Sequence, residues 1–275
     1  MLFARVAHPS RVAPVAPPSF SPVIDVNTFI GGYPWRHVPH PEPEVLVRVL
    51  EREGITSAWV GHLPSAFHRD PQHGNAELLA ALAPHAPMLR AAPIVRPDWP
   101  DWEETLQVLV AQDVAAIRVW PQLWGFAPGD PLLTALGVRC ASLELPLILT
   151  VRFEDLRQRH PLDATPDLSP AHVRELARGG TGARLVVTAA GRDFIEEVHW
   201  GLTPAERALV FWDISWIWGP PTDDLSHLFR TIGAERFVLG TMWPLRLAQV
   251  PRANLALIDA DVADVVFAGP RSWHR

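Results

Sequence analysis

Short, almost continuously apolar runs alternate with longer segments of helical spacing along the whole chain. The runs predict eight strands, at Val23–Asn27, Ser57–Gly61, Leu89–Val95, Ala115–Trp120, Leu145–Val151, Arg184–Thr188, Ala208–Asp213 and Arg236–Gly240. Because apolar and polar residues do not strictly alternate within them, these runs are typical of parallel strands covered on both faces.

The intervening segments predict helices, several of them with terminal signals. Apolar residues at 45, 46, 49 and 50 give Glu42–Glu53 a helical face, and Gly54 ends it. Asn75 is predicted to cap a helix that runs to Leu82, and Asp101 forms a capping box with Glu104. Ser169-Pro170 is read as an N-cap followed by proline. Further helices are predicted over Pro131–Leu143, Asp193–Trp200, Asp224–Ile232 and from Arg252 onward.

Eight β-then-α units in 275 residues predict a (β/α)8 TIM barrel of the α/β class. We expect a single barrel domain over residues 23–275, preceded by a proline- and alanine-rich arm over residues 1–22. The proline-containing segment between Phe153 and Leu168 is expected to be a loop after the fifth strand. In this fold the active site lies at the carboxyl ends of the strands.

Composition excludes several kinds of chemistry. All 24 basic residues are arginines, which excludes Schiff-base lysines, a lysine-containing phosphate loop and a carbamylated lysine between two metals. The single cysteine, Cys140, excludes an internal disulfide or a cysteine-based metal site. A net charge of −6 with interspersed signs argues against a nucleic-acid partner. The interrupted apolar stretches argue against a signal peptide or a membrane span, so we expect a cytoplasmic protein.

Three segments in order resemble the amidohydrolase superfamily, in its amidohydrolase-related branch, which includes decarboxylases of aromatic and amino-carboxymuconate acids. Ile24-Asp25-Val26-Asn27-Thr28-Phe29-Ile30-Gly31 resembles an opening of Ile-Asp, His-x-His and Gly. Ala116–Pro121 resembles a strand that ends in Leu-His-Pro, and Gly240-Thr241-Met242-Trp243-Pro244 resembles a closing Gly-Ser/Thr-Asp with a nearby proline. The resemblance implies an amidohydrolase-like barrel that acts as a hydrolase or carboxy-lyase. It also implies that Asp25 supports the first strand.

The residues expected to bind metal in that family are replaced here. The first-strand ligands fall on Asn27 and Phe29, and the last-strand aspartate falls on Met242. The family's fifth-strand histidine corresponds to Thr150 or Val151 here, and its sixth-strand histidine corresponds to Thr188 or Ala189. Since zinc is bound by His, Cys or carboxylate, we expect no metal and no other cofactor at this position. A relocated site would have to use the loop histidines His37, His40, His62, His68 and His73.

Polar and aromatic residues at the strand ends are the candidate site. Arg118 and Arg152 are predicted either to clamp a carboxylate or phosphate, or to pair with acidic residues in a polar plug. Asp213 is either a general base, with its pKa raised by apolar neighbours, or a partner of an arginine or a loop amide. Tryptophans near the strand ends either line a ligand pocket or fill the barrel mouth. We expect ligand contacts from Asn27, Arg118, Trp120, Arg152, Thr188 and Trp243, with Asp213 as the catalytic candidate.

Three functions remain open from the sequence. In the first alternative, the chain is a metal-free protein of the amidohydrolase type that binds a small acidic ligand or serves as a scaffold. Alternatively, it is a metal-free enzyme that uses Asp213 with Arg118 or Arg152 in hydrolysis or decarboxylation of a small carboxylate or amide. The third alternative is a metal-dependent hydrolase with relocated ligands. A homodimer is expected from the family resemblance alone.

Overall fold

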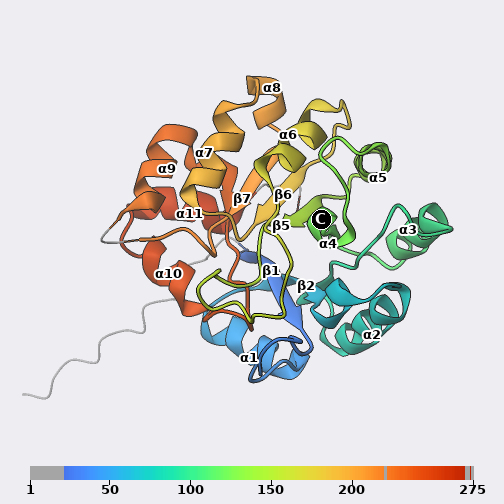
Figure 1. Cartoon of the computed structure of the whole chain (residues 1–275). Helices are drawn as coiled ribbons and strands as arrows, with labels where there is room; N and C mark the ends of the chain where they lie inside the picture. Colours follow the sequence, from blue (N-terminus) through green and yellow to red (C-terminus); the bar gives the residue numbers. More distant parts are fainter. Residues whose placement is uncertain (1–21, 220–221, 270–272, 274–275) are drawn as a thin grey trace, which may run out of the picture.

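Eight parallel strands form the centre of the computed structural model, and helices surround them (Figure 1). The structure describes residues 22–219, 222–269 and 273, so the predicted arm lies outside the described residues except for Pro22. The strands are β1 (Ile24–Ile30), β2 (Ser57–His62), β3 (Leu89–Ala91), β4 (Ile117–Val119), β5 (Leu147–Thr150), β6 (Leu185–Thr188), β7 (Val210–Asp213) and β8 (Phe237–Val238). This arrangement confirms the predicted barrel class.

The regular strand pairs fall into two sheets, ordered β1-β2-β3 and β4-β5-β6-β7-β8. Backbone contacts join them at both seams. A parallel bridge pairs Ile94 with Arg118, beyond the end of β3. At the other seam the Val26 amide donates to the Leu239 carbonyl at 2.9 Å, and the Met242 amide donates to the Asn27 carbonyl at 2.7 Å. The ring of strands is therefore closed by irregular backbone at both seams.

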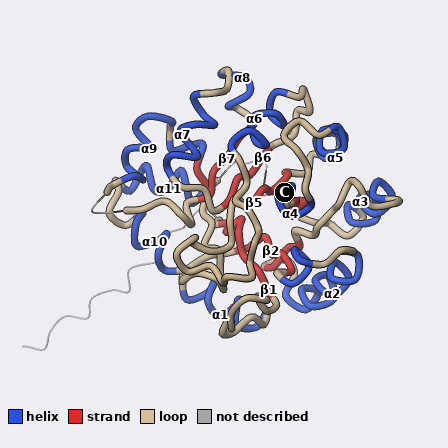
Figure 2. The backbone as a smooth tube through the Cα atoms, viewed as in Figure 1, coloured by secondary structure: helices blue, strands red, loops and turns tan. Residues whose placement is uncertain are grey.

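The helices lie outside this ring (Figure 2). They are α1 (Pro43–Arg52), α2 (Gln72–Leu82), α3 (Trp102–Val110), α4 (Pro121–Trp124), α5 (Pro131–Ser142), α6 (Pro170–Arg178), α7 (Arg192–Trp200), α8 (Pro204–Arg207), α9 (Asp224–Ile232), α10 (Gln249–Leu255) and α11 (Ala260–Ala268). The main apolar core lies between these helices and the outer faces of the strands, and it includes Leu46, Leu78, Leu136, Val173 and Leu228. Cys140 is buried in this core on α5.

Of the three predicted helix caps, Ser169 holds the predicted position before Pro170, whereas Asn75 does not cap α2 and Asp101 forms no capping box. Helix α2 begins at Gln72, and Asn75 is a buried residue whose amide bonds both backbone groups of Ile94. Asp101 precedes α3 in the left-handed region, with φ of 58°, and its side chain makes no capping bond. The Ser169 hydroxyl bonds the His172 ring instead of capping α6. The Asn75 side chain is engaged by Ile94 and the Ser169 hydroxyl by the His172 ring, so neither is left to bond a helix amide.

The predicted strand ends also shift. Strand β1 runs to Ile30, so Asn27 and Phe29 lie inside it and not beyond its end. Strand β3 ends at Ala91, two residues before Pro93, which has no amide hydrogen for a strand ladder. The segment between Phe153 and Leu168 is a loop, as predicted, and it crosses the carboxyl end of the barrel (Figure 2). We call residues 153–168 the β5–α6 loop.

Candidate functional site

Four polar side chains from three strands meet inside the carboxyl end of the barrel. Asp25 and Asn27 come from β1, Arg118 from β4 and Asp213 from β7, and each is fully buried. We call these four residues the interior polar cluster. The Asn27 amide links its members, since its Nδ2 donates to Asp213 Oδ2 at 2.7 Å and its Oδ1 accepts from Arg118 at 3.2 Å.

Asp213 is held by three hydrogen bonds. Its Oδ1 accepts from the Ala189 amide at 2.8 Å, and its Oδ2 accepts from Asn27 and from the Ser215 hydroxyl at 2.8 Å. Burial raises the pKa of Asp213, while these donors oppose the rise. A Cβ atom added to Gly240 would lie 2.5 Å from Asp213 Oδ2, so glycine is required there for the strands to approach. The carboxylate therefore already has protein partners and no exposed surface.

Asp25 joins the first strand to the last. Its Oδ2 accepts from the Thr241 hydroxyl at 2.6 Å, and its Oδ1 accepts from the amides of Asn27 and Thr241. Burial raises the pKa of Asp25 to about 6, and the hydrogen bonds from Thr241 and Asn27 act in the opposite direction. These contacts suit a residue that supports the first strand.

Arg118 supplies the positive charge of the cluster. Besides Asn27, it donates to the Thr28 carbonyl at 3.4 Å, and its guanidinium lies 4.4 Å from the ring centroid of Phe29. Burial lowers the pKa of Arg118 to about 9, while Asp213 and Asp25 oppose that change. The guanidinium thus lies within a polar plug that includes both carboxylates.

The structure does not form the predicted clamp from Arg118 and Arg152. Arg118 is enclosed in the interior cluster, whereas Arg152 contacts the β5–α6 loop, where its Nε lies 2.9 Å from Asp167 Oδ2. The Arg152 guanidinium also packs on Trp216, 5.5 Å from the ring centroid. The surroundings of Arg118 match the other alternative, a polar plug, and Arg152 pairs with an acidic residue of the loop. Strand order alone did not say which arginine is enclosed.

The residues at the expected metal-ligand positions do not fit a metal ion. Phe29 packs against Arg118, and Met242 Sδ accepts from Trp216 Nε1 at 3.0 Å. The hydroxyls of Thr150 and Thr188 bond each other at 2.9 Å. Neutral hydroxyl, amide and thioether groups beside an arginine cation are a poor ligand set for a divalent ion.

The loop histidines do not supply a replacement. His62 Nδ1 bonds the Ser65 hydroxyl at 2.7 Å, and His73 lies 3.2 Å from Glu77. Within the part of the chain that the structure describes, no group of three or more His, Cys, Asp or Glu side chains could hold a metal. The described histidines therefore give no geometric support to the alternative of a relocated metal site.

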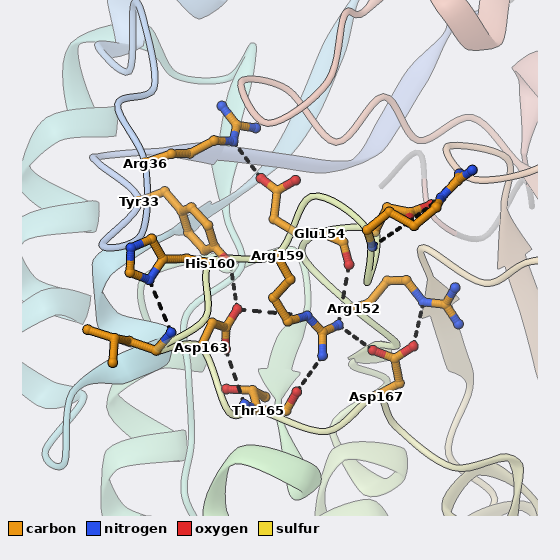
Figure 3. Close-up of polar contacts among 12 residues, drawn as sticks. Tyr33, Arg36, Arg152, Glu154, Arg159, His160, Asp163, Thr165 and Asp167 are labelled. Atoms are coloured by element: carbon orange, nitrogen blue, oxygen red, sulfur yellow. Dashed lines mark hydrogen bonds and ion pairs between the residues drawn. The ribbon is translucent and has the colours of Figure 1, made fainter.

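An aromatic layer and the β5–α6 loop cover the interior cluster. Phe153 at the start of the loop packs on Phe29, Tyr33 and Trp120, with ring centroids 5.8–6.2 Å apart. The Tyr33 hydroxyl donates to Asp163 at 3.1 Å, and burial beside this carboxylate raises the pKa of Tyr33 (Figure 3). The loop is thus fixed to the segment that follows β1.

Charged residues hold the loop in the same place. Arg36 Nε donates to Glu154 at 2.6 Å, and Asp167 pairs with both Arg152 and Arg159 (Figure 3). The Arg159 guanidinium also donates to the Thr165 carbonyl at 2.6 Å. Sequence reasoning missed these contacts, because their residues lie in loops where neither apolar spacing nor strand position signals a role.

The predicted ligand residues divide into two sets. Asn27, Arg118, Trp120 and Thr188 are fully buried, so none of them is open to a ligand in this structure. Arg152 and Trp243 are half-buried and lie nearer the solvent. The tryptophans mostly fill the mouth, since Trp120 and Trp216 belong to an apolar cluster with Phe29, Phe153 and Met242.

Comparisons with known proteins bear on the fold. No protein-family model and no curated protein matches the sequence. A crystal structure of 2,6-dihydroxybenzoate decarboxylase with bound 2,6-dihydroxybenzoate superposes with a TM-score of 0.71 at 13% identity, and the match covers 93% of this chain and 100% of that one. The fold is the amidohydrolase barrel.

Two further structures carry the same likeness. The 5-carboxyvanillate decarboxylase from Sphingomonas paucimobilis gives a TM-score of 0.60 at 11% identity, covering 90% of this chain and 96% of that one. An amidohydrolase from Burkholderia multivorans gives a TM-score of 0.61 at 13% identity, and the match covers 92% of this chain and 99% of that one. Among the residues that the structure describes, no helix is long and apolar enough to cross a membrane.

Proposed function

We propose that this protein binds a small anionic ligand at the mouth of an amidohydrolase barrel and does not carry out metal-dependent hydrolysis. The observation that carries the proposal is the Asn27–Arg118–Asp213 arrangement, which occupies the carboxyl end of the barrel interior. A hydrolytic metal site needs anionic or imidazole ligands with an open position for water. Here the carboxylates already accept hydrogen bonds from protein groups, and a guanidinium lies beside them.

A measurement of bound metal tests the claim that this protein does not carry out metal-dependent hydrolysis. The purified protein is dialysed against chelator, incubated with zinc or manganese, desalted, and analysed by inductively coupled plasma mass spectrometry. We expect substoichiometric metal. Because His73 and Glu77 form an exposed pair, a His73→Gln variant measures adventitious surface binding. One tightly held ion per chain that persists in His73→Gln would overturn the proposal.

A second candidate is an enzyme that decarboxylates or hydrolyses a small carboxylate without a metal. It is favoured by the neighbouring barrels, two of which are named as decarboxylases of aromatic carboxylates. In this case Asp213, whose pKa is raised by burial, acts as the general acid or base. Reaching it requires opening of the β5–α6 loop, since Asp213 is fully buried.

Product analysis separates the two candidates. The protein is incubated with 2,6-dihydroxybenzoate or 5-carboxyvanillate, and substrate loss is followed by liquid chromatography. Turnover that disappears in Asp213→Asn but survives in the exposed-site variant His73→Gln supports the enzyme. Binding of carboxylates without turnover in the wild-type protein supports the non-catalytic function.

A further inference from the structure

Arg246, in the segment after β8, is a half-buried arginine without an acidic partner. Its guanidinium carbon lies 4.4 Å from the ring centroid of Trp216 and 5.8 Å from that of Trp218. No carboxylate among the described residues forms an ion pair or hydrogen bond with this guanidinium. The residues outside the described ranges contain no aspartate or glutamate. The side-chain carboxylates of this chain therefore leave the Arg246 charge unpaired.

The acidic groups nearest to Arg246 are already used. Asp213, Glu154 and Asp155 all oppose the lowering of the Arg246 pKa that burial causes, so they lie within electrostatic range. Each nevertheless accepts hydrogen bonds from other residues. A partly desolvated cation gains from a partner that forms direct hydrogen bonds, and no side-chain carboxylate among the described residues supplies one.

Arg152 lies on the same indole. Its guanidinium carbon is 5.5 Å from the Trp216 ring centroid. Its Nε pairs with Asp167, and its two terminal nitrogens point away from that carboxylate (Figure 3). Trp216 is itself fixed by the hydrogen bond from its Nε1 to Met242. Both guanidinium groups therefore pack on the same indole at the barrel mouth.

Packing on an aromatic face leaves a guanidinium free to bind an anion. The ring contacts the face of the guanidinium, while its N–H groups lie in the guanidinium plane and match the two oxygens of a carboxylate. We propose that Arg246 and Arg152, both packed on Trp216, form a carboxylate-binding site at the barrel mouth. This inference rests on the proposed anionic ligand and assigns its anchor to a residue outside the strands.

The test compares Arg246→Met with a matched control. Arg207→Met removes a guanidinium that packs on Trp200 at 5.0 Å, on α8 at the outside of the barrel. Isothermal titration calorimetry is performed on the full chain with acetate, benzoate and inorganic phosphate as probes. We expect Arg246→Met to bind benzoate about 10- to 100-fold more weakly than wild type, because charge-assisted hydrogen bonds are lost. Arg207→Met should bind as wild type does, and Arg246→Lys should recover only part of the loss.

The outcomes separate this inference from the proposed function. Equal carboxylate affinity in wild type and Arg246→Met would overturn the Arg246 site while leaving an anion site elsewhere at the mouth. No binding of any probe to the wild-type protein at millimolar concentration would overturn both. Tenfold tighter binding of phosphate than of either carboxylate would overturn the carboxylate assignment. Circular dichroism of each variant, matched to wild type, confirms that binding is measured on folded protein.

Discussion

Replacing Arg118 by methionine tests whether its charge stabilises the two buried carboxylates. Methionine retains much of the apolar stem but removes the guanidinium that contacts Asn27, Thr28 and Phe29. Removing one partner from a buried charged network costs about 3–5 kcal/mol, because the remaining charges lose their compensation. We therefore expect Arg118→Met to lower the free energy of unfolding by about that amount at pH 8.

The pH dependence of this loss distinguishes charge from packing. At pH 5 the buried carboxylates of the variant take up protons, since loss of the cation raises their pKa values further. The destabilisation at pH 5 is therefore expected to be smaller than at pH 8 by about 1–2 kcal/mol. A pure packing defect would give the same loss at both pH values.

Urea-induced unfolding, followed by tryptophan fluorescence and far-ultraviolet circular dichroism at pH 5 and pH 8, measures both quantities. The exposed Arg230 on α9 provides the control, and Arg230→Met should change stability by less than about 0.5 kcal/mol. A loss below about 1 kcal/mol for Arg118→Met at pH 8, or equal losses at the two pH values, would refute this account of the cluster.

Three further predictions follow from the same contacts. The folded state keeps a proton on Asp25, whose pKa is about 6, at pH values where the unfolded chain has lost it, so stability should fall between pH 4 and pH 7. Asp25→Asn should remove about 3 kcal/mol of that pH dependence in urea titrations, and an unchanged pH profile would contradict the assignment. The double variant Asn27→Asp/Asp213→Asn exchanges the amide and the carboxylate and so restores their hydrogen-bonded pair. It should recover more than half of the stability that Asp213→Asn alone loses in thermal unfolding. If the losses of the two single variants simply add in the double variant, the pair does not contribute as described. Asn75→Ala should cost about 2–4 kcal/mol in chemical denaturation, since it leaves both backbone groups of Ile94 without partners, and a neutral effect would show that water replaces the amide.

The barrel follows from sequence because its signal is repetitive and local. Each apolar run needs only its own residues to predict a buried strand, and all eight runs overlap a strand in the structure. The predicted helix starts at Pro131, Pro170 and Asp224 are confirmed, whereas the side-chain bonds at helix starts were not predictable. Asn75 has the composition of a cap, yet its side chain serves a strand segment 19 residues away.

For the interior polar cluster, the sequence pointed to three of its members but not to how they contact one another. Strand ends pointed to Asn27, Arg118 and Asp213. However, Asn27 is 91 residues from Arg118 and 186 residues from Asp213 along the chain, and a single sequence has no signal at that range. Arg246 had no signal because it follows the last strand in an irregular segment. Arg246 stands out because its guanidinium has no carboxylate partner among the described residues of the folded chain. That property depends on where all the acidic residues lie, which the sequence does not give.

The interior polar cluster also constrains how this barrel can change through substitution. A carboxylate introduced at Met242 alone would add a third buried negative charge beside Asp25 and Asp213, with Arg118 as their cation. A histidine introduced at Asn27 alone would break the amide link between Arg118 and Asp213. Each single step toward a metal-binding barrel therefore passes through a destabilised intermediate. The positions are coupled, so substitutions at them are expected to be tolerated in combination better than one at a time.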